Sequence, residues 1–284
     1  MSLYLGAAAQ AEFDAEVKHL YQGAALLNGS TRVRRNVVGS TCNFRLMGRG
    51  IATQKPTSAD VVPMNITHAN VPATLGNWTA GDYTDIFDQA EVNFDEKQEL
   101  AQAVAGAMGR RSDQIVIASL LAGATLASVG TNIGGTASGF NLDKLVRVSA
   151  NLTANGVPND GKRHLAITAR GLEQALLISQ FSSADYNSLR ALQSGELKSF
   201  MGFTWHVFDT RTAAGQEGGL SLVSAGIRQG YAWHEQAVGL ATGIEIRTEI
   251  NYIPEKTSWL VNGLFKAGGV VIDALGALGV QYTE

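Results

Sequence analysis

Residues 155–211 read NGVPNDGKRHLAITARGLEQALLISQFSSADYNSLRALQSGELKSFMGFTWHVFDTR, and this stretch decides the fold. A polar turn leads into a strand at residues 163–169, a helix at residues 171–180, a second polar stretch, and a further strand that opens at Gly202. This order of strand and helix, with a helix upstream and strands downstream, predicts an α+β body. The stretch contains no obvious catalytic set, which favours a structural role over an enzymatic one.

A long helix is predicted upstream of this stretch. Asn93, with a glutamate three residues later, has the N-cap pattern of a helix that runs to about Ala122 and breaks near Gly109 or Ser112. Without the break it would measure about 45 Å. Residues 115–124 are apolar all round, so we expect them to be buried on every side.

A shorter helix connects the long one to the opening stretch. Asn141 is its predicted N-cap, and Gly156 and Pro158 end it. One face is expected to be apolar and the other polar. The apolar stripe contains Leu142, Leu145, Val146, Ser149 and Leu152, and the polar face contains Lys144, Arg147 and Asn151.

The last forty residues and those just before them are typical of strands. Isoleucines, a threonine and a tyrosine alternate with polar residues over 244–252, which predicts one buried face and one wet face. Residues 264–284 predict two further short strands joined by glycine turns.

Residues 42–85 combine glycines and prolines with short alternating runs, which predicts a long hairpin with an irregular return strand. Such an arm has no core of its own. An isolated hairpin is marginally stable in water, and long loops usually have a task. We therefore expect this arm, and the first forty residues, to pack against a neighbouring subunit. Residues 12–27 are predicted to form a short amphipathic helix, and residues 31–39 an extended segment.

Composition excludes several classes of function. The 284 residues carry a net charge of −3 with 17% charged residues, so the chain lacks the basic surface that duplex binding requires. The single cysteine, Cys42, and five scattered histidines give no metal-ligand spacing, and we expect no cofactor and no metal. No apolar run reaches the roughly 18 residues of a membrane span, and no signal peptide pattern is present. We expect a chain made in the cytoplasm, with no membrane partner.

Three stretches resemble chemical sites only at first sight. Residues 130–139 are glycine-rich but lack the Gly-Lys-Ser/Thr of a phosphate loop, so a linker is the better interpretation. Asp160 stands near Lys162, Arg163 and His164 without a second carboxylate, which favours a solvated turn over an acid/base site. Aspartates at 82, 85 and 88 miss the spacing of a calcium loop.

Basic residues are the candidates for contacts between subunits. Arg32, Arg34 and Arg35 form one compact run, and a second run lies at residues 110–111. Each run either lies on a solvated face or pairs with carboxylates of the next subunit, and the sequence leaves both interpretations open. The candidate carboxylates are Glu91, Asp95, Glu96 and Glu99. On the predicted hairpin, Arg45, Arg49 and Lys55 suggest the same role, because charges on an arm select its partner and register.

The order of these elements resembles the major capsid proteins of tailed bacteriophages, which have the Hong Kong 97-type fold. The likeness is strongest in VPNDGKRHLAITARGLEQALL, where Lys162 separates the Gly161 and Arg163 that are adjacent in many members, and it continues at residues 202–208 and in the terminal GGVVIDALGALGVQ. The resemblance divides the chain into an N-terminal arm (1–40), an extended loop (41–85), a peripheral part with a spine helix (86–140), an axial domain (141–243) and peripheral-domain strands (244–284).

The resemblance implies a subunit that self-assembles into hexamers and pentamers of an icosahedral head, assembled in the host cytoplasm, around double-stranded DNA that it encloses without sequence-specific binding. It also implies a separate scaffolding protein, a portal and, in some members, decoration proteins. Some members form lysine–asparagine cross-links, for which Lys55 is the natural donor, but no motif here supports that chemistry. An encapsulin-type compartment is the alternative, and a small hydrolase or binding domain is the third interpretation.

Overall fold

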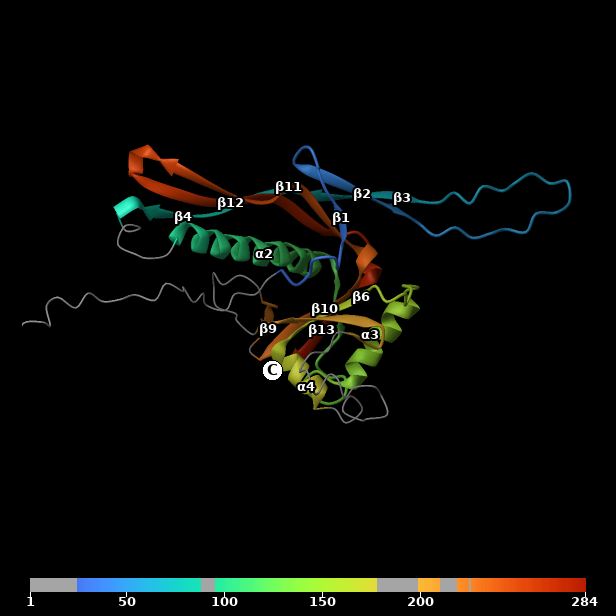
Figure 1. The fold of residues 1–284 in the computed structure, drawn as a ribbon. Coiled ribbons are helices and arrows are strands. Elements are labelled where there is room, and N and C mark those ends of the chain that lie inside the picture. The colour runs from blue at the N-terminus through green and yellow to red at the C-terminus, as the bar shows by residue number, and fades with distance from the viewer. Residues whose placement is uncertain (1–24, 88–94, 178–198, 210–218, 225) are drawn as a thin grey trace, which may run out of the picture.

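The computed structural model describes residues 25–87, 95–177, 199–209, 219–224 and 226–284. Within them the chain is mixed helix and sheet, which confirms the predicted α+β class (Figure 1). A four-stranded sheet has the order β1-β11-β12-β4, a second sheet has the order β5-β13-β10-β6-β8-β7 with β9 beside β10, and β2 pairs with β3. The strands are β1 Arg32–Arg34, β2 Thr41–Met47, β3 His68–Thr74, β4 Gly76–Asp85, β5 Thr125–Val129, β6 Arg163–Thr168, β7 Ser199–Phe200, β8 Phe203–Phe208, β9 Leu222–Ser224, β10 Ile227–His234, β11 Val238–Ile253, β12 Ser258–Val271 and β13 Ala277–Thr283.

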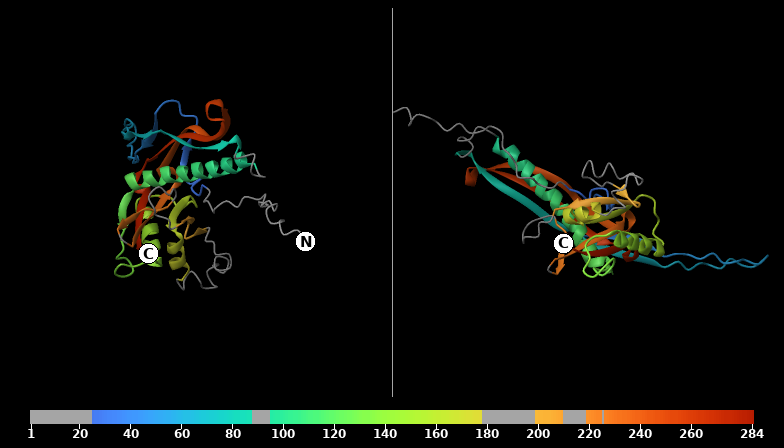
Figure 2. Two further views of the ribbon diagram at one scale, coloured as in Figure 1. Left: turned by 90° about the vertical axis from the view of Figure 1, so that its left-hand side faces the viewer. Right: turned by 90° about the horizontal axis from the view of Figure 1, so that it is seen from below.

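Helix α2 (Glu96–Gly123) is the predicted long helix, and it runs along the four-stranded sheet (Figure 2). Its N-cap is Asp95, whose carboxylate accepts a hydrogen bond from the Lys97 N–H at 3.2 Å, whereas Asn93 lies outside the described residues. The helix does not break at Gly109 or Ser112. A Cβ atom at Gly109 would meet Ala25 Cβ at 3.5 Å, an ordinary contact distance, so this glycine lies within the continuous helix without a bend.

The apolar end of α2 is not buried on every side, as the sequence predicted. Leu120 is fully buried, but Leu121 is 44% exposed. One side of the helix lies against β12, where Gly263 faces Val104 and Met108. Near its C-terminal end, Val116 and Leu120 also pack in a buried cluster with residues of the second sheet, including Trp233. The apolar end therefore lies between the two sheets, and only part of its circumference, which includes Leu121, stays exposed.

The predicted two-faced strand at residues 244–252 is part of β11, but its apolar face is not buried in the single chain. The exposed fractions are 41–44% for Ile244, Ile246, Ile250 and Tyr252. Helix α2 covers the neighbouring strand β12, where Val261 and Phe265 are buried, and β1 pairs only with residues 239–241 of β11. The outer half of β11 therefore stays open along one side.

The return strand of the predicted hairpin differs from expectation. Residues 76–85 form β4, which pairs along its whole length with residues 258–267 of β12 and so belongs to the four-stranded sheet. The hairpin itself consists of β2 and β3, in register from Thr41 opposite Thr74 to Met47 opposite His68. Its inner end does have a small core, in which Cys42 and Phe44 are buried. The prediction of an arm without a core applies only to residues 48–67, which form no helix or strand.

The second sheet lies between α2 on one side and two helices, α3 (Leu142–Ala154) and α4 (Ala169–Leu176), on the other (Figure 1). Asn141 caps α3 as predicted, accepting from the Lys144 N–H at 2.9 Å. The faces of α3 differ from the predicted stripe. Val148 is buried and Val146 is 46% exposed, while Lys144 is buried and donates from Nζ to the Ser138 carbonyl at 2.7 Å. That hydrogen bond compensates for the buried ammonium group.

Candidate assembly interface

The outer part of the β2–β3 hairpin reaches away from the rest of the molecule (Figure 1). Apolar side chains lie along it with nothing of the described chain against them: Ile51 is 81% exposed, Val61 77% and Val62 62%. Exposed apolar side chains in this number mark a binding surface more often than a solvated loop. The hairpin is therefore the first element of the candidate interface.

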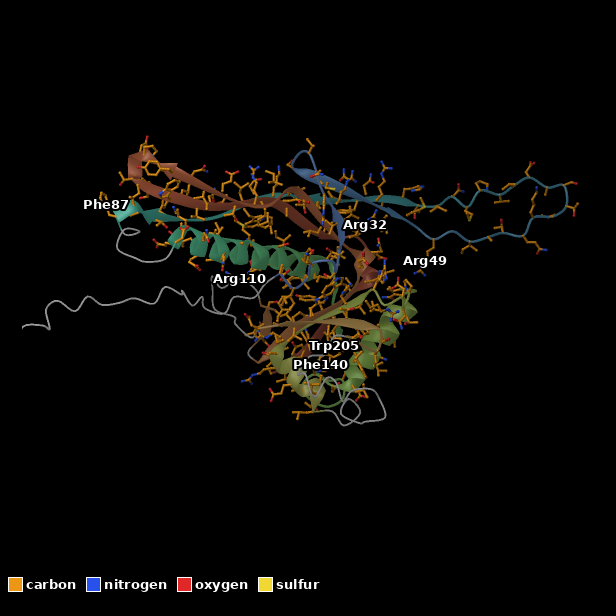
Figure 3. The ribbon with its side chains drawn as sticks, viewed as in Figure 1. Arg32, Arg49, Phe87, Arg110, Phe140 and Trp205 are labelled. Carbon is orange, nitrogen blue, oxygen red and sulfur yellow. The ribbon has the colours of Figure 1, made fainter. Side chains whose placement is uncertain are left out.

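Four of the sequence-predicted arginines meet at the base of this hairpin. Arg32 and Arg34 lie on β1, Arg45 lies on β2, and Arg49 follows directly after β2. Arg32 and Arg45 line two adjacent hollows of about 340 and 380 Å³, and Arg49 lines the first of them. The Nη2 atom of Arg49 donates to the Asn155 carbonyl at 2.5 Å, which holds the hairpin against the end of α3 (Figure 3).

The other predicted cations lie elsewhere. Arg35 forms an exposed ion pair with Glu245 at 3.6 Å, and Lys55 lies on the outer hairpin. Arg111 stacks over the Trp78 ring at 3.7 Å and donates to Gln114. Within the chain itself, Arg111 of the second basic run thus packs against an aromatic ring.

The predicted carboxylates gather at the opposite end of the molecule. Asp95, Glu96 and Glu99 begin α2, and Glu91 lies outside the described residues. In Figure 3, Phe87 marks this end, whereas Arg32 and Arg49 lie at the base of the hairpin, on the far side of α2 and the four-stranded sheet. None of the described carboxylates in this set reaches the four arginines within one chain.

The segment at residues 25–31 ties the two sheets together, and sequence reasoning missed it. The carboxylate of Asp113 on α2 accepts hydrogen bonds from Leu26 N at 2.6 Å and Leu27 N at 3.1 Å. Trp233 on β10 donates from Nε1 to the Ser30 carbonyl at 2.8 Å. Burial raises the pKa of Asp113, against the effect of those two N–H donors. No local pattern signals these contacts, because the partners lie 86 to 203 residues apart.

A pair of histidines lies beneath this segment. His164 Nδ1 and His206 Nε2 are 3.1 Å apart, and both rings stack on Trp233. Burial, with the nearby His206 and His234, lowers the pKa of His164 to about 4. Burial also lowers the pKa of His206. His164 therefore belongs to the packed junction between sheets, and not to an acid/base site with Asp160.

Asp160 lies in a turn, as the sequence predicted. Its carboxylate accepts from the Lys162 N–H at 3.1 Å and pairs with His234 Nε2 at 3.1 Å. Among the residues that the structure describes, no group of three histidine, cysteine, aspartate or glutamate side chains is placed to hold a metal ion. In the same part of the chain, no helix has both the length and the apolar character needed to cross a membrane.

Comparison with known proteins agrees with this architecture. A family model described as phage capsid protein matches residues 5–284. The capsid of the cyanophage P-SCSP1u is 16% identical, with 99% of this chain and 94% of that chain covered and a TM-score of 0.75. The head structure of Helicobacter pylori bacteriophage KHP40 is 13% identical, covering 99% and 98%, with a TM-score of 0.74. A structure of Mycobacterium phage Che8 is 17% identical, covering 96% of each chain, with a TM-score of 0.71.

At these identities the solved structures establish a shared fold. No curated protein sequence matches the chain. The match to the family model, which extends over nearly the whole sequence, does not favour the encapsulin alternative. The chain belongs to the phage capsid protein family.

Proposed function

We propose that this chain is the repeating subunit of an icosahedral phage head, a structural protein without catalysis that assembles into hexamers and pentamers. The observation that carries the proposal is the β2–β3 hairpin, whose outer part holds largely exposed apolar side chains away from the rest of the described chain. The exposed apolar face of β11 adds a second uncovered surface. Surfaces of this kind favour a subunit of a larger assembly over an isolated globular protein.

The physical requirements of a closed shell fit this form. One chain must occupy several slightly different surroundings in hexamers and pentamers, and extended arms on a rigid body can adapt to each. Many modest contacts then act together, because each additional contact within an assembly forms at high effective concentration. The packed junction around Trp233 would supply the rigid body and the hairpin the adaptable arm.

The division of the chain follows the same proposal. We assign residues 1–40 to an N-terminal arm, 41–85 to the extended loop, 86–140 and 244–284 to the peripheral part, and 141–243 to the axial domain. Strand β4 lies at the end of the extended loop and joins the peripheral sheet through β12.

We also propose that the shell encloses double-stranded DNA without reading its sequence and forms in the host cytoplasm. The net charge of −3 suits a wall that contains DNA and does not bind it tightly. A separate scaffolding protein and a portal are the expected partners, with decoration proteins as a further class.

Electron microscopy of the expressed protein tests the proposal. Negative-stain images of the chain, produced with and without the scaffold gene beside its own, should contain rings or closed shells. A protein that stays a monomer of about 30.0 kDa under both conditions, as measured by sedimentation, would contradict the proposed function.

A further inference from the structure

The four arginines at the base of the hairpin carry charge that the described part of the chain does not balance. We call Arg32, Arg34, Arg45 and Arg49 the arginine notch. All four side chains are exposed. Asp273 is the one carboxylate that lines the two hollows of the arginine notch. It caps a short turn, because its carboxylate accepts a hydrogen bond from the Leu275 N–H at 3.0 Å.

Three of these arginines have no anionic partner in the described part of the chain. Arg32, Arg34 and Arg45 form no ion pair and no side-chain hydrogen bond there, and Arg49 bonds only to a neutral carbonyl group. Like charges gathered at one place repel one another, and an anion bound among them removes that cost. A guanidinium group also offers a planar fork of donors that suits a carboxylate. The notch therefore fits an anionic partner with several carboxylates.

The chain carries such an anion at its other end. We call this the acidic end, and its members are Asp82, Asp85, Asp95, Glu96, Glu99 and Glu255. Two lysines at this end lie over aromatic rings. Lys97 Nζ is 4.8 Å from the centre of the Trp259 ring, and Lys256 Nζ is 3.9 Å from the centre of the Tyr83 ring. Carboxylates thus outnumber cations at this end. The elongated peripheral part separates the acidic end from the notch, so the two cannot meet within one chain (Figures 1 and 3).

We infer that the arginine notch of one copy receives the acidic end of a second copy. This inference rests on the proposed function and names the partner surface within the shell. A contact between two different surfaces of identical chains is head-to-tail, and repetition by rotation closes a ring. Charges of this kind select the register of the contact more than they strengthen it. Carboxylates of a second copy are favoured over DNA phosphates, because the chain itself carries several exposed or half-exposed carboxylates at its other end.

Charge reversal tests the pairing. The variant Arg34→Glu with Arg45→Glu, called the notch reversal, reverses two of the four charges and so cancels the net charge of the notch, and it removes no hydrogen bond or ion pair of the described chain. As a control, Arg147→Glu with Arg170→Glu makes the same charge change on exposed positions of α3 and α4. A third protein combines the notch reversal with Asp82→Arg and Glu255→Arg, so that two reversed charges on the notch meet two reversed charges on the acidic end. Each is expressed with the scaffold gene, and closed shells are counted by negative-stain microscopy after sedimentation.

We expect the notch reversal to lower shell yield about tenfold, the control to stay within about twofold of the unaltered protein, and the combined variant to recover most of the loss. Unchanged yield from the notch reversal would overturn the inference, as would a combined variant no better than the reversal alone. Unchanged shell yield together with weaker binding of the unassembled variant to duplex DNA would assign the notch to phosphates instead. In all three outcomes the unaltered protein still forms shells, so the proposed function stands. Circular dichroism of the unassembled variants checks that each is folded.

Discussion

His164 shows how the meaning of a residue depends on its partners. Beside Asp160 in the sequence it suggests acid/base chemistry, but in the fold its ring lies against His206 and Trp233 beneath the segment at residues 25–31. Asp160 instead pairs with His234, on the next strand. The histidine pair is therefore part of the packed junction. Its protonation affects the free energy of unfolding of the chain.

The lowered pKa of His164 predicts a loss of stability in acid. The folded state holds the ring neutral down to about pH 4, whereas the unfolded chain takes up the proton near 6.5. Stability from this group is therefore complete above about pH 6.5, falls as the pH drops toward 4, and changes little below that. The loss at pH 4.5 is on the order of 2 kcal/mol.

Urea unfolding of the unassembled chain at pH 7 and pH 4.5 measures this loss. His164→Asn keeps a polar atom near the position of Nδ1 but cannot titrate, so it should lose about 2 kcal/mol less than the unaltered protein between the two pH values. His206 and Asp113 titrate in both proteins, so the difference isolates His164. Equal losses in the two proteins would show that its protonation is not linked to folding.

At the scale of elements, the contact of α2 with β12 depends on a residue without a side chain. A Cβ atom at Gly263 would lie 2.5 Å from Val104 Cγ1 and 3.2 Å from Met108 Cε. The helix therefore lies closer to the strand than a residue with a side chain at position 263 would allow without a shift. Gly263→Ala forces the helix away or strains those side chains. We expect a loss of 1–3 kcal/mol, about the usual cost of overpacking.

Thermal melting compares this variant with Gly130→Ala, where a Cβ atom meets nothing within 4 Å. The control should change the free energy of unfolding by well under about 1 kcal/mol. A Gly263→Ala protein as stable as the control would mean that the helix does not pack this closely in solution.

The same elements show what local pattern can predict. The period of apolar residues identifies the strands and helices, including the cap at Asn141, because these depend on neighbours within a turn. Pairing between segments that are far apart in the chain is not visible in a single sequence. The pattern therefore predicts residues 76–85 as part of the hairpin, whereas in the structure they form β4 and pair with β12. Burial depends on which neighbouring elements cover a face of a helix. Val146, which the predicted stripe of α3 includes, is therefore exposed, and Val148 is buried. Arg32, Arg34, Arg45 and Arg49 are exposed, as charged side chains usually are, but their position around two hollows depends on how β1 and β2 are placed by their pairing with β11 and β3.

At the scale of the whole molecule, the rigid body and the outer hairpin should be separable. Residues 50–65 lie beyond the last hydrogen-bonded pair of the hairpin, Gly48 N to Thr67 O at 2.8 Å, and Ile51 and Val61 there are largely exposed. Removal of this segment therefore takes little packing from its own chain. In an assembly the same segment would carry contact with a neighbour, so its loss should affect closure and leave folding intact.

The test replaces residues 50–65 with Asn-Gly, a pair that favours the tight turn of a two-residue hairpin. Arg49 and its hydrogen bond to Asn155 are kept. We expect the far-ultraviolet circular dichroism spectrum to be retained and the melting temperature to change by less than about 4 °C, since less than about 1 kcal/mol is lost. Shell yield by sedimentation and negative-stain microscopy should fall at least about tenfold, because association depends on a few well-buried contacts. Shells at the unaltered yield would show that the outer hairpin is not an assembly arm, and a protein that no longer melts cooperatively would show that the arm and the body are one folding unit.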